Sequence, residues 1–258
     1  MENVSKALLI AAGIMLSVMI LSLLFIGYNQ ISAYYGDKSK ITQAQQLSEF
    51  NSSFENYNRK NVRGSDLLSL INKVIDYNER EVYPTGKGYE RMIITINLGS
   101  SSIISQLKYN NTTGTNLFTQ TVISNSVSNS NATVSVYQNA DKGVKAIAGA
   151  EQKAIEIGQN AGLSLDSEKL QKLTSNISNI MDDTNVKRNL IFRNVLKRDD
   201  LNTTELQAIK NSTCTYYQYM QFKRAYFNCT NFEYDENTGR VCKIEYEISV
   251  KDGLVQFN

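Results

Sequence analysis

The sequence feature that most constrains this chain is an uncharged stretch from Ala7 to Ile26, in which Ser17 and Ser22 are the polar side chains. Its twenty residues rise about 30 Å as an α-helix, which matches the hydrocarbon core of a bilayer. We therefore predict a transmembrane signal anchor over residues 7–28, after a short N-terminal segment, residues 1–6. The residues that we expect in the lipid include Ala7, Leu8, Leu9, Ile10, Leu16, Leu21, Leu23, Leu24, Phe25 and Ile26.

Two other interpretations fit this stretch less well. A cleaved signal peptide has an apolar core of about 7 to 15 residues after a clearly basic start. Here the core is longer, Glu2 offsets the charge of Lys6, and the one passable cleavage position follows Ala33, well beyond the apolar residues. A buried core helix of a soluble protein seldom contains so long a run without a charge. The sequence therefore favours an uncleaved anchor.

The direction of insertion depends on more than the flanking charges. Lys6 precedes the span, whereas Lys38 and Lys40 follow it, so the positive-inside bias is nearly neutral. A long domain can be translocated regardless of such charges. The rest of the chain is rich in Asn, Ser and Thr and contains no His and no Trp. We therefore expect a single-pass protein of the cell membrane whose C-terminal domain lies outside the cytoplasm.

The segment after the span, residues 29–60, is predicted to be an amphipathic helical extension. Helix formers dominate from Lys40 to Glu55, and apolar residues recur there at steps of three or four. Such a stripe packs either on its own domain, which is the ordinary use, or against another subunit. It could also continue the membrane helix as one rod. The candidate assembly stripe consists of Ile41, Ala44, Leu47, Phe50 and Phe54.

The remaining residues, 61–258, are predicted to form an α+β domain. A helix is expected after Ser65, its apolar face formed by Leu67, Leu68, Ile71, Val74 and Ile75. A period of two then predicts a strand from Tyr89 to Leu98, and weaker strands are expected at 119–123 and 133–137 around an Asn/Ser-rich loop, 124–132. Further helices are expected from Ala140, including one that starts with a capping box of Asn202 and Glu205 and runs through Lys210.

The end of the chain carries the clearest β pattern and predicts an antiparallel sheet that closes with a C-terminal hairpin. Its two strands are residues 222–234 and 241–250, joined by a turn centred on Asn237 and Thr238 with Gly239 in a left-handed position. In the second strand, the alternation predicts that Cys242, Ile244, Tyr246, Ile248 and Val250 share the buried face.

The three cysteines, Cys214, Cys229 and Cys242, allow at most one internal disulfide. The predicted hairpin places Cys242 opposite Glu233 or Tyr234, four or five residues from Cys229, which is beyond disulfide reach. A disulfide between Cys214 and Cys229 therefore remains as one expectation, and three reduced, packed thiols remain as the other.

The composition argues against most catalytic sites, metal sites and nucleic-acid-binding surfaces. Without histidine, the Ser-His-Asp, Cys-His and common zinc hydrolase sites are ruled out, and we expect no metal and no cofactor. A net charge of +2 gives no field that would attract nucleic acid. The locally basic residues Lys187, Arg188, Arg193, Lys197 and Arg198 are expected to form a solvated helix face beside Asp199 and Asp200. We do not expect an enzyme.

The order of an N-terminal span, an amphipathic extension and a mixed domain that closes with a hairpin resembles type IV pilins and the pseudopilins of secretion systems. The prepilin leader and the Glu at the fifth mature position of those families are missing, and Glu2 is the nearest equivalent. The opening MENVSKALLIAAGIML and the late segment FKRAYFNCTNFEYDENTGRV also resemble a group of uncharacterised single-pass membrane proteins of anaerobic Gram-positive bacteria.

The resemblance implies a non-enzymatic, membrane-anchored surface protein that acts as a pilin-like or secretion-apparatus assembly subunit. Its expected partners are the lipid bilayer and either further copies of the chain or other envelope proteins. The alternative is a monomeric membrane-tethered binding domain that recognises a ligand or an envelope component through its Asn/Ser-rich loops.

Overall fold

The computed structural model describes residues 2–80, 91–109, 116–118, 122–124, 143–198 and 200–258. The chain forms two units, Met1–Ser53 and Phe54–Asn258. The division falls between Ser53 and Phe54, seven residues before the boundary expected after residue 60. The expected loop 124–132 and the strand 133–137 lie outside the described residues, except for Ser124.

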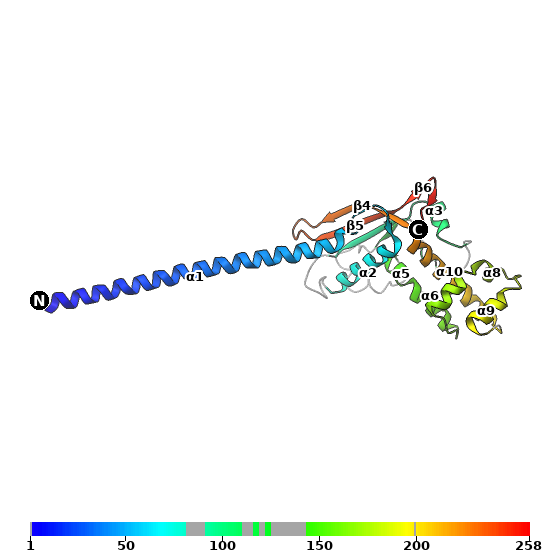
Figure 1. The fold of residues 1–258 in the computed structure, drawn as a ribbon, viewed down its shortest axis with the longest axis horizontal. Helices are drawn as coiled ribbons and strands as arrows, with labels where there is room; N and C mark the ends of the chain where they lie inside the picture. Colours follow the sequence, from blue (N-terminus) through cyan, green and yellow to red (C-terminus); the bar gives the residue numbers. More distant parts are fainter. Residues whose placement is uncertain (1, 81–90, 110–115, 119–121, 125–142, 199) are drawn as a thin grey trace, which may run out of the picture. The chain divides into compact units, whose positions relative to one another are not determined.

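The first unit is a single helix. Helix α1 runs from Glu2 to Glu55, so it also contributes the first two residues of the second unit. Its 54 residues correspond to a length of about 80 Å. Neither Gly27 nor Gly36 interrupts the helix, and the expected span and extension are therefore one continuous element (Figure 1).

The second unit is an α+β domain built on an open five-stranded sheet with the order β1-β4-β5-β2-β3. The strands are β1 (Val62–Arg63), β2 (Ile93–Asn97), β3 (Val122–Ser124), β4 (Tyr226–Tyr234) and β5 (Val241–Ile248). A small separate ribbon of β6 (Val250–Lys251) and β7 (Leu254–Val255) follows. The sheet is mixed rather than antiparallel, because β2 runs parallel to β5. The long, helix-rich connection between these two strands permits this pairing, which a short turn could not.

The expected strand pattern around β2 is confirmed. Met92, Ile94, Ile96 and Leu98 are all fully buried on one face. Helix α2 (Gly64–Arg80) packs against this strand and buries Leu67, Leu68, Ile71 and Val74, as its spacing predicts, whereas Ile75 is only half-buried. Near the end of α2, the Asn78 side chain donates to the Met92 carbonyl at 2.9 Å and accepts from the Met92 N–H at 2.9 Å.

The β4–β5 hairpin follows the sequence from Tyr226 onward, but the expected strand 222–234 was too long at its start, because residues 222–224 belong to α10. Gly239 has a φ of 68°, and the Asp235 N–H donates to the Arg240 carbonyl at 2.8 Å across the turn. Glu233 pairs with Lys243 and Tyr234 with Val241, so Cys242 lies at the irregularity between them, as expected. Burial of Ile244, Tyr246 and Ile248 is confirmed, whereas Cys242, expected on the same buried face, is only half-buried. The alternation ends after Ile248, because Ser249 is buried and Val250 is exposed.

The other helices are short, apart from the last. They are α3 (Ser101–Gln106), α5 (Gly143–Ala148), α6 (Ala150–Asn160), α7 (Ser167–Thr174), α8 (Ile177–Met181), α9 (Arg188–Leu196) and α10 (Thr203–Arg224). The predicted break near residues 182–185 separates α8 from α9.

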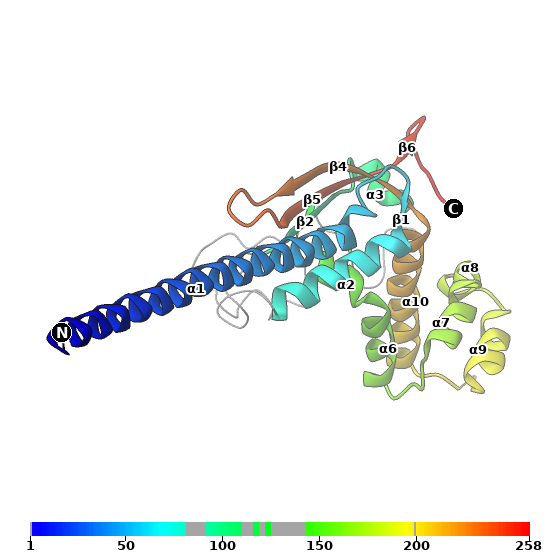
Figure 2. The same ribbon diagram turned by 60° about the vertical axis from the view of Figure 1, so that its left-hand side comes forward.

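Helix α10 is the central helix of the second unit. Its predicted capping box is present, since the Asn202 side chain accepts from the Glu205 N–H and the Glu205 carboxylate accepts from the Asn202 N–H. The helix is 22 residues long and ends at Arg224, not at Lys210 as expected. It packs against α6, α7, α2 and α8, and Figure 2 shows α6 and α7 on opposite sides of it.

Candidate functional site

The apolar part of α1 is the strongest candidate for a functional surface. The helix is long and apolar enough to cross a membrane, and none of its most apolar window is buried within the chain. Leu9 and Met15 are 75% and 77% exposed. The two serines satisfy their hydroxyls inside the helix, since Ser17 donates to the Gly13 carbonyl and Ser22 to the Val18 carbonyl, both at 2.8 Å. The surface thus presents no unsatisfied hydrogen-bonding side chain, a property that lipid requires.

Aromatic and aliphatic side chains continue to be exposed after the span. Tyr28 is 70% exposed, and Tyr34 and Tyr35 form an edge-on pair with ring centroids 5.8 Å apart. Ile31 and Ile41 are exposed to a similar extent. Amphipathic tyrosine rings are typical of the membrane–water interface.

Ile41 lies apart from the rest of the predicted assembly stripe, because Ala44, Leu47, Phe50 and Phe54 fall within about 120° on one side of the helix. Each step of three residues turns an α-helix by about 300°, so Ile41 and Phe50 point in opposite directions. Ile41 and Ala44 are exposed, whereas Phe54, the first residue of the second unit, is 1% exposed. Within the second unit, the Lys73 ammonium lies 4.6 Å above the Phe54 ring. Phe54 therefore belongs to the core of its own domain.

The expected disulfide between Cys214 and Cys229 is absent, and all three cysteines are thiols. Cys214 lies ten residues before the end of α10, about 15 Å along its axis, whereas Cys229 is in the strand that follows. The Cys214 sulfur contacts the Met181 sulfur at 3.9 Å, and Cys229 donates to the Asn231 carbonyl. Burial raises the pKa of the Cys229 thiol, which lowers its reactivity at neutral pH.

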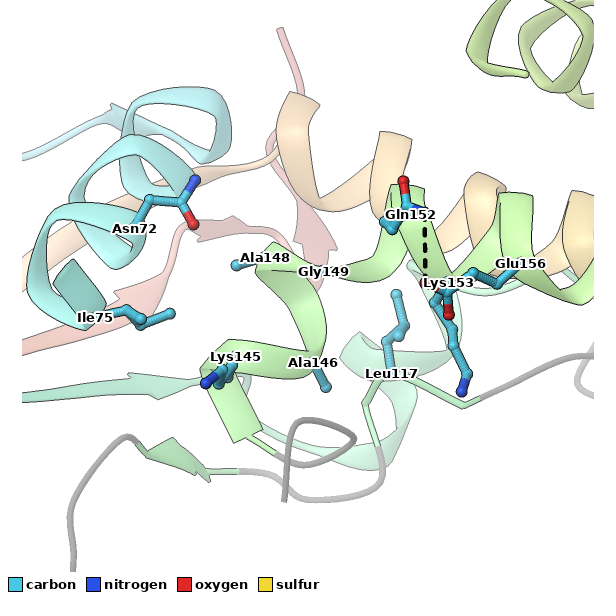
Figure 3. A pocket seen from close by; sticks show the side chains of 10 residues that line it. All are labelled: Asn72, Ile75, Leu117, Lys145, Ala146, Ala148, Gly149, Gln152, Lys153 and Glu156. Carbon is cyan, nitrogen blue, oxygen red and sulfur yellow. Dashed lines mark hydrogen bonds between the residues drawn. The ribbon is translucent and has the colours of Figure 1, made fainter. Parts of the chain in front are cut away.

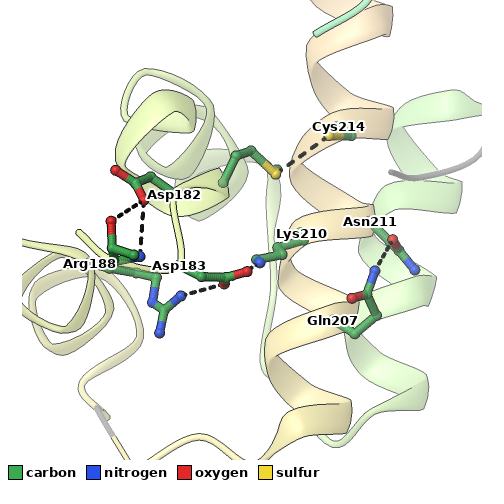
Figure 4. Close-up of polar contacts among 9 residues, drawn as sticks. Asp182, Asp183, Arg188, Gln207, Lys210, Asn211 and Cys214 are labelled. Carbon is green, nitrogen blue, oxygen red and sulfur yellow. Dashed lines mark hydrogen bonds and ion pairs between the residues drawn. The ribbon is translucent and has the colours of Figure 1, made fainter. Parts of the chain in front are cut away.

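A cluster of charges joins the α8–α9 loop to α10 (Figure 4). The Asp183 carboxylate accepts from Arg188 at 2.7 Å and from the Lys210 ammonium. Lys210 is 9% exposed, and its hydrogen bond and charge are the main reasons why the pKa of Asp183 is lowered. The adjacent carboxylates Asp182 and Asp183 serve different partners, because Asp182 accepts from the Thr184 hydroxyl at 2.7 Å. They are structural groups and do not form an acid–base pair.

A pocket of about 370 Å³ lies between α2, α5 and α6 (Figure 3). Ile75, Leu117, Ala146 and Ala148 form its apolar part, and Lys145, Lys153 and Glu156 are the charged residues of its lining. The Lys145 ammonium lies 3.4 Å from the Glu79 carboxylate. This pocket could not be predicted from local sequence patterns, because its lining comes from three separate segments.

Among the described residues, no group of three or more Cys, Asp or Glu side chains is arranged to hold a metal ion. A scan against models of protein families, a search of curated proteins and a search of solved structures each returned no match.

Proposed function

We propose that this chain is a non-enzymatic, single-pass surface protein, anchored in the cell membrane by α1, which acts as an assembly subunit of the pilin-like or secretion-apparatus type. The observation that carries the proposal is the continuity of α1. One helix contains both the apolar segment and an exposed, partly apolar segment that follows it. The absence of histidine from the sequence supports a role without catalysis.

The part of α1 beyond the bilayer needs a partner. From Gly27 to Ser53 it extends about 40 Å at 1.5 Å per residue. A solitary helix in water is only marginally stable, and most helices in proteins are stabilised by packing of an apolar face. Ile31 and Tyr35, four residues apart, are both exposed on the same side. The partner that matches an apolar face emerging from the same membrane is α1 of a second copy.

Cysteine cross-linking in native membranes tests this assembly. The variants Ile31→Cys and Tyr35→Cys are expected to give disulfide-linked dimers on mild oxidation. Asn29→Cys is the matched control, because Asn29 is about 200° around the helix from Ile31. The wild-type chain, whose thiols all lie in the second unit, supplies the background. Equal cross-linking at all three positions, or none at any, would contradict a specific helix pair.

The extracytoplasmic placement of the second unit is tested on intact cells. External protease is expected to remove the second unit and leave a membrane-embedded fragment of α1, identified by mass spectrometry. Protection until lysis would reverse the direction of insertion and direct the search for partners to the cytoplasm.

A monomeric membrane-tethered binding domain is the second candidate, and the pocket between α2, α5 and α6 favours it. Pockets of about this size bind small ligands, and an apolar lining with a few polar groups is their usual composition. A ligand screen by thermal shift, with Ala148→Phe as the variant that fills the pocket, addresses this function. A ligand that stabilises the wild type but not Ala148→Phe, together with absent α1 cross-linking, would establish the binding domain in place of the assembly subunit.

A further inference from the structure

The pocket between α2, α5 and α6 lies at an interruption between two helices. Helix α5 ends at Ala148 and α6 begins at Ala150, and Gly149 between them is part of the pocket lining. A Cβ added at Gly149 would lie 3.5 Å from the Lys145 carbonyl oxygen, which is an ordinary contact distance. The lack of a side chain at Gly149 therefore leaves space in a pocket of about 370 Å³.

One wall of the pocket is apolar. Leu117, between α3 and β3, is 6% exposed, and Ile75, Ala146 and Ala148 are half-buried. These side chains come from three segments, and Figure 3 shows them around one space. Such a wall offers dispersion contacts and no hydrogen bonds, so it fits the apolar part of a ligand.

The charges around the pocket balance one another. Lys145, Lys153 and Glu156 belong to the lining, and the Lys145 ammonium pairs with the Glu79 carboxylate of α2 at 3.4 Å. Among these described residues, two positive charges thus accompany two negative charges. An ionised ligand would lose part of its hydration here without meeting an unbalanced opposite charge, and this favours an uncharged ligand.

The side chain of Asn72 can orient an uncharged ligand. Asn72 is an exposed residue of α2, and its amide points towards the α5 side of the pocket (Figure 3). No hydrogen bond joins this amide to another of the described residues. Because an amide group both donates and accepts, Asn72 can pair with a second amide or with a hydroxyl.

We propose that this pocket binds a small uncharged molecule that has an apolar chain or ring and an amide or hydroxyl head group. The apolar part packs on Ile75, Leu117 and Ala148, and the head group forms hydrogen bonds with Asn72. The proposal rests on the binding function given above as the second candidate, for which it names the ligand class. It does not depend on the pairing of α1.

Protection of an introduced thiol tests the pocket in the full chain, embedded in lipid nanodiscs. Ala148→Cys places a thiol in the apolar wall, and Ala161→Cys, at the C-terminal end of α6, is the matched control. Labelling by iodoacetamide is followed by mass spectrometry of the peptide that carries each thiol, which separates it from the native cysteines. The probes are hexanamide, hexanoate and hexylammonium, which share one chain and differ in the charge of the head group.

Hexanamide is expected to bind with a dissociation constant on the order of 1 mM, as is typical of a fragment-sized ligand. At about 10 mM it should slow the labelling of Ala148→Cys about tenfold and leave that of Ala161→Cys unchanged. The two ionised probes should slow the labelling of Ala148→Cys less than about twofold. Asn72→Ala in the Ala148→Cys background should reduce the protection by hexanamide to about threefold.

The opposite outcomes are distinct. Equal or greater protection by hexanoate or hexylammonium would overturn the uncharged ligand class and leave the pocket as a binding site. Protection by none of the probes, or equal protection of both thiols, would overturn the proposal, and the thermal-shift screen with Ala148→Phe would then decide the second candidate function alone. Cross-linking of α1 is measured separately and is not affected by either result.

Discussion

Helices α1 and α10 reverse the usual relation between polarity and burial. The segment of α1 from Ala7 to Ile26 is uncharged and wholly exposed, whereas α10 buries Glu205, Lys210 and Gln218 in the centre of its unit. The polar groups of α10 find partners inside the chain: Glu205 binds Arg198 at 3.1 Å, Lys210 binds Asp183, and the Gln218 side chain accepts from the Leu117 N–H at 3.0 Å.

The difference shows whether each helix is stabilised by its own chain or by its surroundings. A buried polar helix is stable when its hydrogen bonds are made within the fold, and α10 makes most of them there. The hydroxyls of Ser212 and Thr213 are exceptions, without a hydrogen-bond partner among the described residues. An exposed apolar helix gains nothing from its own chain, so the environment that stabilises α1 must lie outside it.

The largest effect is expected when charge is placed in the exposed apolar segment of α1, which tests whether lipid surrounds it. Leu16→Arg combined with Ile20→Arg should cost about 6 kcal/mol of membrane insertion, because each arginine near the centre of a span costs about 3 kcal/mol. We expect the double variant to be released by alkaline extraction of membranes. Gln45→Arg with Thr42→Arg is the control outside the span and should stay bound. Retention of the span variant would mean that lipid is not the environment of α1.

A matched pair of glycine substitutions compares the two environments directly. A Cβ at Gly64 would lie 1.7 Å from the Phe222 carbonyl oxygen of α10, whereas a Cβ at Gly36 in α1 meets nothing within 4 Å. Gly64→Ala should therefore lower the free energy of unfolding by about 3 kcal/mol or more. Gly36→Ala should be neutral or favour the helix by about 0.5 to 1 kcal/mol. Denaturant unfolding followed by circular dichroism measures both, and a smaller effect at Gly64 than at Gly36 would contradict the packing.

The first turn of α10 offers a smaller test. Asn202→Ala removes the side chain that accepts from the Glu205 N–H at 2.9 Å and should cost about 1 kcal/mol of stability. Lys187→Ala is a suitable control, since Lys187 occupies the N-cap of α9 without a side-chain capping bond. If the two variants unfold at the same denaturant concentration, the capping box does not contribute to stability.

The smallest expected effect is the acid dependence of the Asp183 cluster. Hydrogen bonding and charge from Lys210 lower the pKa of Asp183 in the folded chain. A lowered folded pKa adds stability above the ordinary carboxyl pKa of about 3.9, and this stability is lost as the pH falls through the folded value. Asp183→Asn should thus be less stable than the wild type at pH 7. The difference in their free energies of unfolding should decrease below about pH 4. A difference in the free energy of unfolding that does not change with pH would show that titration of Asp183 does not contribute to stability.

The sequence predicted those features that depend on neighbouring residues. The capping box of Asn202 and Glu205, the left-handed Gly239 and the buried face of Met92 to Leu98 follow from local pattern, and the structure contains all three. The helical conformation of the second half of α10 was not predicted. Ser212, Thr213 and Thr215 are buried there, but their polar side chains are typical of an exposed segment. Only the surrounding helices make such a composition stable.

Features that combine distant segments could not be read from the sequence. The parallel pairing of β2 with β5 joins residues about 150 positions apart, such as Ile94 and Ile244. The α8–α9 loop is likewise fixed by a distant residue, because Lys210 of α10 binds Asp183. Ile41 falls outside the assembly stripe for a simpler reason: three steps of three residues turn a helix by about 180° in total, so Ile41 points away from Phe50.

The two hydrogen bonds between Asn78 and Met92 have a consequence for the whole sheet. A parallel pair of strands has no hairpin turn to set its register, and a slip of one residue would exchange its two faces. The Asn78 amide binds both backbone groups of Met92, immediately before β2, as a neighbouring strand would. Helix α2 thereby determines where β2 begins, and with it which of its side chains face the core.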